Sequence, residues 1–476
     1  MFSLRHRSGQ ALLLLLVAFL IRSPFYGNPV IHSDEQFYLL VGDRLLHGVW
    51  PYVDIFDRKP VGLFLLFAAI RSVGGDGVLM YQLAATLVAA ATAWLVARIV
   101  DRLTPDAASP LASFGAGMIY LVWIIVFDGA GGQSAIWGNA LMAGAALLVL
   151  DTTRDRRHIN VRGAGAMLLI GMAMQIKYTA MFEGIFFGLT LLWAARDAGR
   201  TTARLAADAA LWIGAALLPT ALAWAVYAAA GHGDAFVFAN FVSIFGQQND
   251  DGLGSNLLKL AGGIALASPP ILLAWRGRRA APFALAWLAS AGIAVGIMHR
   301  FELLYFLPIS LPLAVAAGTG LAKGSIATSR RWFMAVLLFG LVAATISSGT
   351  RLARRGNARQ VANLVEMIGP KPQGCLLAFG TEAILYYLTQ SCLPTPFIFG
   401  SHLSRMTEAH GLDVDQATET ARVLAANPGV IVVRPAKPDT NLTTQAMVAA
   451  AIAQRYQLVG IVRVGTAPRA VYRLRQ

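Results

Sequence analysis

Charged residues are scarce in this sequence, and their scarcity excludes an ordinary soluble domain. Only 13% of the 476 residues are Asp, Glu, Lys or Arg, whereas 57% are hydrophobic and the mean hydropathy is +0.59. A soluble globular domain has about 25% charged residues. A long chain with so few charges cannot cover its surface with polar side chains, so we expect it to face lipid over much of its area.

Acidic residues and cysteines are also few. The chain has 25 Asp and Glu against 39 Lys and Arg, which gives a net charge of +14. The basic residues form short clusters between apolar runs rather than an aromatic-interleaved stripe, which argues against nucleic-acid binding. Cys375 and Cys392 have no metal-binding spacing, so we expect no metal and no cofactor. They could form a disulfide if their region is extracytoplasmic, or remain two separate buried thiols.

Long apolar runs fill the first 350 residues. Because a transmembrane helix needs about 20 apolar residues, the runs predict about eleven spans. They lie at roughly 10–27, 78–100, 110–127, 135–151, 163–176, 178–195, 209–230, 256–275, 281–298, 302–322 and 332–349. The run at 61–73 is too short to cross alone, and we expect it to be re-entrant or interfacial. No cleavage pattern follows the first run, so it is expected to be a span rather than a signal peptide.

Arginine and lysine mark alternate loops. Arg5 and Arg7 precede the first span, and the basic loops that follow are 98–102, 154–162, 196–204, 276–279 and 323–331. The loops between them, such as 128–134 and 231–255, are nearly free of Arg and Lys. Basic loops stay in the cytoplasm. This pattern predicts a multi-pass membrane protein with a cytoplasmic N-terminus and an extracytoplasmic C-terminal part.

The chain changes character after residue 350. The segments GCLLAFG and GVIVV predict buried strands, LVGIVRVG and AVYRLR predict a hairpin, and 415–426 and 443–456 predict helices. We therefore expect a mainly α, polytopic transmembrane domain over 1–350 and a small periplasmic α/β domain over 351–476.

The first external loop, 28–60, is unusually polar. It holds a fifth of all the acids in the chain, namely Asp34, Glu35, Asp43, Asp54 and Asp57. From Glu35 to His47 the apolar residues recur at nearly helical spacing, which predicts an amphipathic helix on the membrane surface with Asp34 at or near its N-cap. Two explanations remain open at this point. The acid pair could simply stabilise the helix start and Lys59 could snorkel to the interface, or these groups could form a site.

Several short motifs in this sequence resemble those of a known family. They are DEQFY, HGVWPY and DRKP in the first loop, IGMAMQIKYTA further on, and HRFELLYFLPISLPLAVAAG on a late helix. Together with the basic N-terminus and the C-terminal domain, they are similar to the GT-C class of membrane glycosyltransferases. The bacterial branch of that class includes the lipid A aminoarabinose transferases and relatives of the protein O-mannosyltransferases.

The resemblance implies roles for residues of the first loop and of a late helix. Asp34 matches the catalytic acid and Glu35 its acidic neighbour. Lys59, with Arg58 beside it, matches the lysine that contacts the carrier phosphate. Arg300 and Tyr305 match residues around the same phosphate. As an alternative, Arg300 could instead form a local charge pair with Glu302.

Two further positions are less clearly matched. Lys177 matches a family lysine whose role the sequence does not state, and it could simply cap a helix end. Many relatives carry a second acid in the external loop that reads FDGAGGQSAIWGN here. Asp128 is the candidate, and Gln133 and Asn139 stand where acids would be expected. A metal held between two acids is therefore not expected.

The implied reaction is the transfer of a hexosyl or pentosyl group from a polyprenyl-phosphate donor to a hydroxyl of a lipid, glycan or protein acceptor. A carboxylate such as Asp34 would take the hydroxyl proton, and a single displacement would invert the anomeric centre. Cations would stabilise the leaving phosphate. The alternatives are a transporter or flippase of lipid-linked sugars, a ligase that moves a whole glycan, and a structural membrane protein.

Overall fold

The computed structural model describes residues 7–105, 109–248, 252–279 and 281–475. Arg5 of the predicted cytoplasmic N-terminus and residues 249–251 of the predicted external loop therefore lie outside the described part. The chain divides into two compact units. Unit 1 comprises Met1–Pro24, Leu83–Ala223 and Asp251–Ser348, and unit 2 comprises Phe25–Gln82, Trp224–Asp250 and Gly349–Gln476.

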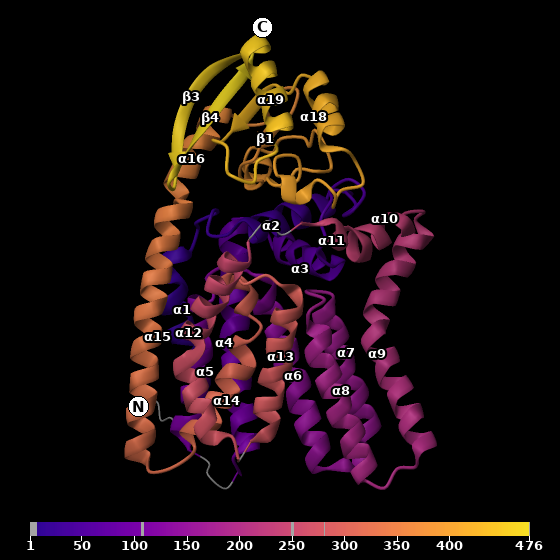
Figure 1. Cartoon of the computed structure of the whole chain (residues 1–476), viewed down its shortest axis with the longest axis vertical. Helices are drawn as coiled ribbons and strands as arrows, with labels where there is room; N and C mark the ends of the chain where they lie inside the picture. The colour runs from indigo at the N-terminus through magenta and orange to yellow at the C-terminus, as the bar shows by residue number, and fades with distance from the viewer. Residues whose placement is uncertain (1–6, 106–108, 249–251, 280, 476) are drawn as a thin grey trace. The chain divides into compact units, whose positions relative to one another are not determined.

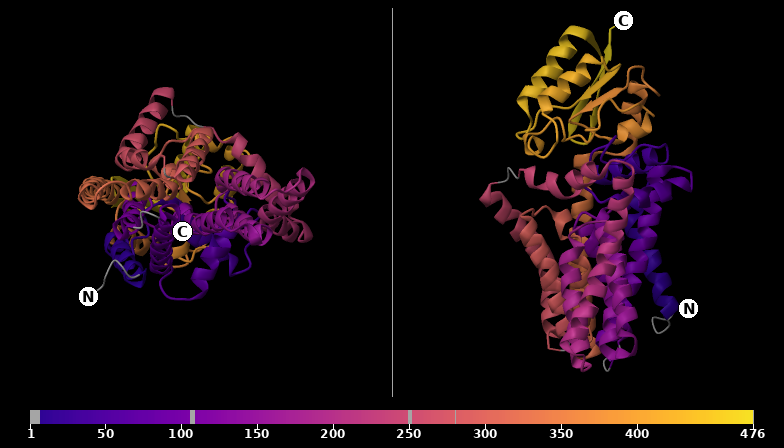
Figure 2. Two further views of the ribbon diagram at one scale, coloured as in Figure 1. Left: turned by 90° about the horizontal axis from the view of Figure 1, so that it is seen from below. Right: turned by 90° about the vertical axis from the view of Figure 1, so that its right-hand side faces the viewer.

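Unit 1 is a bundle of helices that run side by side (Figure 1, Figure 2). Its helices are α1 (Arg7–Arg22), α4 (Gly77–Leu103), α5 (Pro110–Val126), α6 (Ser134–Arg154), α7 (Ile159–Met174), α8 (Ala180–Asp197), α9 (Thr202–Ala229), α12 (Leu253–Gly277), α13 (Pro282–Met298), α14 (Ser310–Leu321) and α15 (Ile326–Arg355). Three of them, α4, α9 and α15, continue into unit 2. Every residue of α14 is buried, and this helix packs against α5, α12 and α13. Gly320 allows the close approach of α12, because a Cβ atom there would overlap the carbonyl oxygen of Leu273.

The apolar runs predicted from the sequence are helical in the structure. Within the described residues, six helical segments are long and apolar enough to cross a membrane, and shorter apolar helices such as α5, α13 and α14 accompany them. The run at 302–322 is divided into a 3₁₀ turn, η5 (Leu303–Phe306), and α14. Pro308 lies between them and has no N–H group to donate to a continuous helix. These helices confirm a multi-pass membrane fold, although they do not fix the number of spans.

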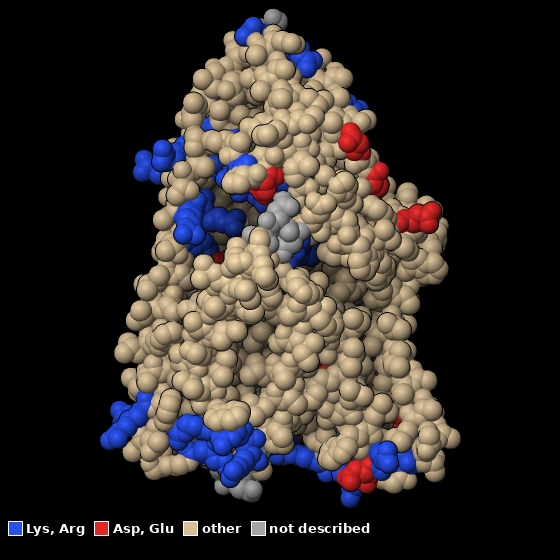
Figure 3. Space-filling view, viewed as in Figure 1, with Lys and Arg blue, Asp and Glu red and all other residues tan. Residues whose placement is uncertain are grey.

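Basic residues of unit 1 gather at one end of the bundle. In Figure 3, Lys and Arg side chains crowd the end at which α15 begins, whereas the belt of the bundle shows almost none. Ion pairs at these loops join Arg102 to Asp151 and Arg156 to Asp197. Charged loops at one end and an uncharged belt are what the positive-inside pattern predicts.

Unit 2 contains a four-stranded sheet in the order β1-β2-β4-β3. Its strands are β1 (Leu376–Phe379), β2 (Val430–Val433), β3 (Tyr456–Val464) and β4 (Ala467–Leu474). β1 and β2 are parallel, and β3 and β4 form the predicted hairpin, which turns at Gly465 with φ +61°. Helices α18 (Gln416–Ala425) and α19 (Leu442–Arg455) lie on one face of the sheet, and α16 (Ala358–Ile368) on the other (Figure 2).

The two cysteines form a disulfide in unit 2. Cys375 precedes β1 and Cys392 follows α17 (Ile384–Leu388), and their Cα atoms are 5.0 Å apart. Of the two states that the sequence left open, the structure therefore has the disulfide. The bond closes the loop that contains β1 and α17.

The first loop of the sequence forms α2 (Ser33–Leu45), and the short apolar run at 61–73 forms α3 (Val61–Ser72); both helices belong to unit 2. The prediction of a helix is confirmed, but the prediction of an amphipathic surface helix is wrong. Residues 35–43 are all buried, because α3 and α17 pack against α2. Arg44 donates hydrogen bonds to the backbone of Tyr386 and Ser391, and Gly42 lets α3 approach closely, since a Cβ there would lie 2.7 Å from the Ala68 nitrogen.

Three short helices follow α9 in unit 2. They are α10 (Gly233–Val237), the single π-helical turn η4 (Phe238–Val242) and α11 (Ser243–Gly246). The turn that precedes α3 packs on them. Tyr227 at the end of α9 donates to the Pro51 carbonyl at 3.1 Å, and the Tyr52 hydroxyl lies 3.4 Å from Asn240.

Candidate functional site

Asp34 lies in the first turn of α2, two residues after the N-cap. The cap is His32, whose Nδ1 accepts a hydrogen bond from the Asp34 backbone N–H at 3.3 Å. The Asp34 side chain therefore does not cap this helix, although its position in the first turn still places an acid at the positive helix end. Its side chain keeps 22% of its surface exposed, whereas Glu35 is fully buried. Of the acid pair, Asp34 is the one that a substrate can reach.

Lys59 extends over the same face of α2 that carries Asp34. Its backbone carbonyl accepts a hydrogen bond from the Tyr52 hydroxyl at 2.7 Å, and Pro60 after it caps α3. The Nζ atom lies 5.9 Å from the centroid of the Tyr38 ring. Tyr38 is four residues after Asp34, and residues with this spacing share a helix face. The structure thus brings the predicted acid and the predicted phosphate-binding lysine to one face of one helix.

Asp57 adds a second carboxylate that the sequence did not single out as a site residue. Burial raises the pKa of its carboxyl group, Lys59 opposes this shift, and the negative charge of Asp34 adds to it. Its Oδ1 accepts the backbone N–H of Arg58 at 2.6 Å. Asp57 therefore lies near both Asp34 and Lys59. The signal for it was the motif DRKP itself, in which the acid stands two residues before the lysine.

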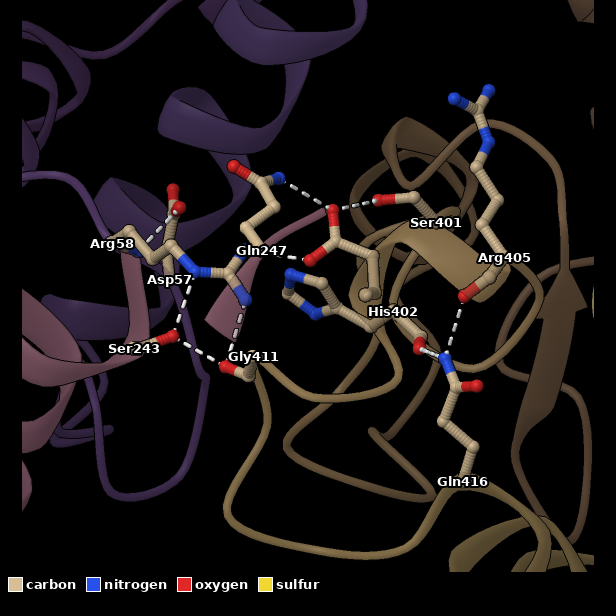
Figure 4. A network of polar contacts seen from close by, with 10 residues as sticks. Asp57, Arg58, Ser243, Gln247, Ser401, His402, Arg405, Gly411 and Gln416 are labelled. Atoms are coloured by element: carbon tan, nitrogen blue, oxygen red, sulfur yellow. Dashed lines mark hydrogen bonds and ion pairs between the residues drawn. The ribbon is translucent and has the colours of Figure 1, made fainter. Parts of the chain in front are cut away.

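Arg58 is held by the protein on all three guanidinium nitrogens (Figure 4). Nε donates to Ser243 Oγ at 2.7 Å, Nη1 to Glu408 at 2.7 Å and Nη2 to the Gly411 carbonyl at 2.8 Å. Gln247 donates to the other carboxylate oxygen of Glu408 at 2.9 Å. Although burial raises the pKa of Glu408, the charge of Arg58 holds it below the usual value. Arg58 therefore anchors the loop that carries Lys59, and we no longer assign it to the donor phosphate.

The imidazole of His402 lies beside this network in an aromatic cluster. Its ring centroid is 5.4–6.5 Å from those of Phe37, Phe56, Phe397 and Phe399. Burial lowers the pKa of His402 to about 3; Glu408 opposes this shift, and the nearby Arg58 and Lys59 add to it. The ring is therefore neutral at pH 7 and packs as an apolar group.

We expect His402 to make the protein less stable in mild acid. An imidazole in the unfolded chain takes up a proton below about pH 6.5, whereas the folded one does so only near pH 3. The free energy of unfolding should fall by about 1.4 kcal/mol per pH unit below 6.5 from this group. His402→Phe keeps an aromatic ring and removes the titration. Thermal denaturation at about pH 7 and pH 5 gives the loss in free energy of unfolding between these pH values. This loss should be about 2 kcal/mol smaller in the variant than in the wild type, and equal losses would contradict the role of His402.

Two of the predicted residues in unit 1 contact each other. Lys177 follows α7, and its Nζ atom lies 5.1 Å from the centroid of the Tyr305 ring in η5. The expected charge pair between Arg300 and Glu302 is absent from the described residues, because Glu302 pairs with Lys259 at 3.1 Å. Arg300 is half-buried.

Asp128 lies in a loop of unit 1 that Arg22 holds in place. Asp128 has a left-handed backbone, with φ +71°. Arg22, at the end of α1, is fully buried and donates to Thr86 at 3.0 Å, to the Gly129 carbonyl at 2.9 Å and to the Gly131 carbonyl at 2.5 Å. Arg22 was not predicted as a functional residue, although a lone arginine at the end of an apolar run was a visible signal.

The other two polar residues of this region belong to the packing of unit 1. Gln133 is the N-cap residue of α6 and is 2% exposed. Asn139 is buried on α6, and its Nδ2 lies 3.4 Å from the Leu307 carbonyl and from Ser310 Oγ. Each unit thus holds one group of predicted residues: Asp34 and Lys59 in unit 2, where Asp57 joins them, and Lys177 with Tyr305 in unit 1.

The sequence of this chain matches no protein-family model and no curated protein. Its fold, however, is similar to those of solved structures. ArnT from Cupriavidus metallidurans in the apo state aligns with a TM-score of 0.67 and 13% identity over 98% of both chains. The same protein bound to undecaprenyl phosphate gives a TM-score of 0.65 and 14% identity over 98% of both chains.

A third similar structure is the arabinofuranosyltransferase AftD from Mycobacteria. It aligns with a TM-score of 0.54 and 15% identity, over 100% of this chain and 40% of AftD. At these identities the likeness concerns the fold. The resemblance read from the sequence motifs is confirmed at that level: the chain has the fold of the GT-C membrane glycosyltransferases.

Proposed function

We propose that this protein is an inverting glycosyltransferase that moves a sugar from a polyprenyl-phosphate donor to a hydroxyl acceptor at the outer face of a bacterial inner membrane. The observation that carries the proposal is the placement of Asp34 and Lys59 over one face of α2, with Asp34 partly exposed. A carboxylate beside a cation is what a base and a leaving phosphate require. The similarity in fold to a structure bound to undecaprenyl phosphate supports the choice of carrier.

In the proposed reaction, Asp34 accepts the proton of the acceptor hydroxyl. The hydroxyl oxygen forms a bond to the anomeric carbon while the bond from that carbon to the phosphate oxygen breaks. The electron pair leaves with the polyprenyl phosphate, and the anomeric centre is inverted. Attack by the acceptor itself needs no covalent intermediate on the enzyme, so one base is sufficient.

Lys59 would stabilise the charge that the phosphate gains as its bond to the sugar breaks. A cation acts most strongly on such charge where water is largely excluded. The Tyr38 ring lies against Lys59, and the buried Arg58 network anchors the loop that carries this lysine. The resemblance also assigns Tyr305 and Arg300 to the carrier phosphate, and Lys177 lies against the Tyr305 ring.

The test is a transfer assay with the purified full chain in proteoliposomes. A radiolabelled sugar on polyprenyl phosphate is supplied together with a membrane extract as the acceptor source. We expect the label to move to the acceptor fraction, with release of unglycosylated polyprenyl phosphate. A change in the sidedness of the intact donor, without release of polyprenyl phosphate, would instead identify a flippase and overturn the proposed function.

A further inference from the structure

Unit 2 holds a second group of cations, separate from Lys59, at the edge of the sheet where the parallel strands end. Arg434 follows β2 directly and Lys437 is three residues further along. Burial lowers the pKa of both groups, and the charges of Arg405 and Arg355 lower both further. In Figure 3, Lys and Arg side chains gather beside the end of α15, where Arg355 lies.

The cluster carries more positive charge than its carboxylates can balance. Arg405 is paired with Asp439 at 3.2 Å, and Arg469 is paired with Glu382. Among the described residues, Arg355, Arg434 and Lys437 have no carboxylate partner. The Arg434 Nε atom is also buried without a hydrogen-bond acceptor in the described part of the chain. A buried donor without an acceptor is costly, and an anionic ligand would supply the acceptor.

The backbone around Arg434 leaves space for this side chain. Gly380 follows β1 with a left-handed backbone at φ +68°, and a Cβ atom there would lie 3.6 Å from Arg434 Cγ. The aliphatic part of the Arg434 side chain therefore crosses the end of β1. It lies beside Ser404, whose Oγ is 3.5 Å from the same Cβ position on Gly380. Ligands of α/β sheets bind outside the carboxyl ends of parallel strands, which is where these groups lie.

We propose that Arg434, Lys437 and Arg355 bind a phosphate group carried by the acceptor. The proposal rests on the glycosyltransferase function above and names the class of acceptor as a phosphate-bearing amphiphile. Arginine and lysine together match a phosphate dianion, because the guanidinium binds two oxygens and the ammonium adds a point charge. A ligand with a single carboxylate would leave most of the positive charge of these three cations unbalanced.

The position of Arg355 argues for an amphiphile rather than a soluble ligand. Arg355 is the last residue of α15, and the predicted apolar run of that helix ends near residue 349. Six residues of helix span about 9 Å. This distance places the cluster at the level of lipid head groups if α15 crosses the membrane. Two sources of such a phosphate remain, the acceptor itself and a membrane phospholipid, and the experiment below separates them.

Protonation of Lys437 gives the site a pH signature. Burial, Arg405, Arg434 and Arg355 lower its pKa to about 8, and Asp439 opposes them. Since only the charged amine attracts an anion, we expect phosphate affinity to fall as the pH rises through about 8. Lys437→Arg keeps its charge throughout this range and should lose most of that dependence.

Binding is measured with the full chain in neutral detergent, using dihexanoyl phosphatidic acid, dihexanoyl phosphatidylcholine and inorganic phosphate as probes. The variant Arg434→Gln/Lys437→Gln is compared with Arg359→Gln/Arg463→Gln, which removes the same charge from exposed positions of unit 2. We expect the affinity for phosphatidic acid to fall about tenfold to hundredfold in the first variant and to stay unchanged in the second. Equal affinity in the wild type and the first variant would overturn the proposal. Tighter binding of inorganic phosphate than of phosphatidic acid would overturn the proposal that the ligand is an amphiphile.

Transfer kinetics then identify the source of the phosphate. If it belongs to the acceptor, the KM for the acceptor should rise in the first variant while the KM for the donor stays constant. An unchanged acceptor KM would assign the site to a phospholipid and overturn the acceptor assignment. Direct binding needs no catalysis, so Asp34→Asn should bind phosphatidic acid with wild-type affinity. Absence of transfer by the wild type, with phosphatidic acid binding retained, would therefore count against the proposed function and not against this site.

Discussion

Replacing Asp34 by asparagine is expected to lower the rate of sugar transfer about 10²–10⁴-fold while leaving the fold and donor binding intact. The amide has nearly the same size as the carboxylate but cannot accept the acceptor proton. The structure gives little reason to expect destabilisation, since the helix cap is His32 and not Asp34. The measurement is the single-turnover rate at saturating donor, together with the affinity for polyprenyl phosphate.

The matched control for this substitution is Asp54→Asn. Asp54 belongs to the same loop and is exposed, and its Oδ2 accepts the Trp50 backbone N–H at 2.7 Å, which an asparagine oxygen can replace. This variant should transfer sugar at the wild-type rate. If Asp34→Asn retained wild-type activity, or if both variants lost activity equally, Asp34 would not be the base.

Replacing Lys59 by glutamine is expected to reduce transfer about 10²–10³-fold, the second largest effect. The amide can still contact the phosphate, but it cannot balance the charge that develops on it in the transition state. The effect should appear mainly in kcat, with a smaller increase in the donor KM, because that charge grows as the bond breaks. Lys59→Arg should recover part of the rate, because it restores the charge in a different geometry.

Lys371→Gln serves as the control, since it removes one exposed lysine from the same unit. Its kinetics should match those of the wild type. An effect of Lys59→Gln on thermal stability alone, with unchanged kcat in the folded fraction, would mean that Lys59 is only a structural group packed on Tyr38.

Elements bounded by local signals were predictable from the sequence. The strand β1 is a short apolar run between Gly374 and Gly380, both with positive φ, and the hairpin β3–β4 turns at Gly465. The apolar runs of unit 1 became helices because a polar group in lipid must be hydrogen-bonded within its own segment. In such cases about a dozen neighbouring residues are sufficient to predict the element.

Features that depend on distant partners were not predictable. The helix α2 shows an apolar periodicity, but its polar face is also covered, because Arg44 bonds to the backbone near residue 386. Arg58 stands beside Lys59 and resembles a second phosphate ligand, yet its partner Glu408 is 350 residues away. Spacing in the sequence does not reveal this, whereas the hydrogen bonds of Arg58 identify it as an anchor of the loop.

The roles of single polar residues were predicted unevenly. Asp34 lies near the N-cap as predicted, but the cap residue is His32, whose imidazole accepts the hydrogen bond. Asp57 was counted among the acids of the loop without a role, and only its proximity to both Asp34 and Lys59 marks it. Arg22 was not considered, although it fixes the loop of Asp128.

The measurement that tests the central claim most directly is a structure of the full chain with polyprenyl phosphate bound. Our account predicts a phosphate oxygen within about 2.7–3.2 Å of Lys59 Nζ, with the Asp34 carboxylate facing the position of the sugar. A phosphate bound far from Lys59, with the Asp34 side chain directed into open water, would contradict it.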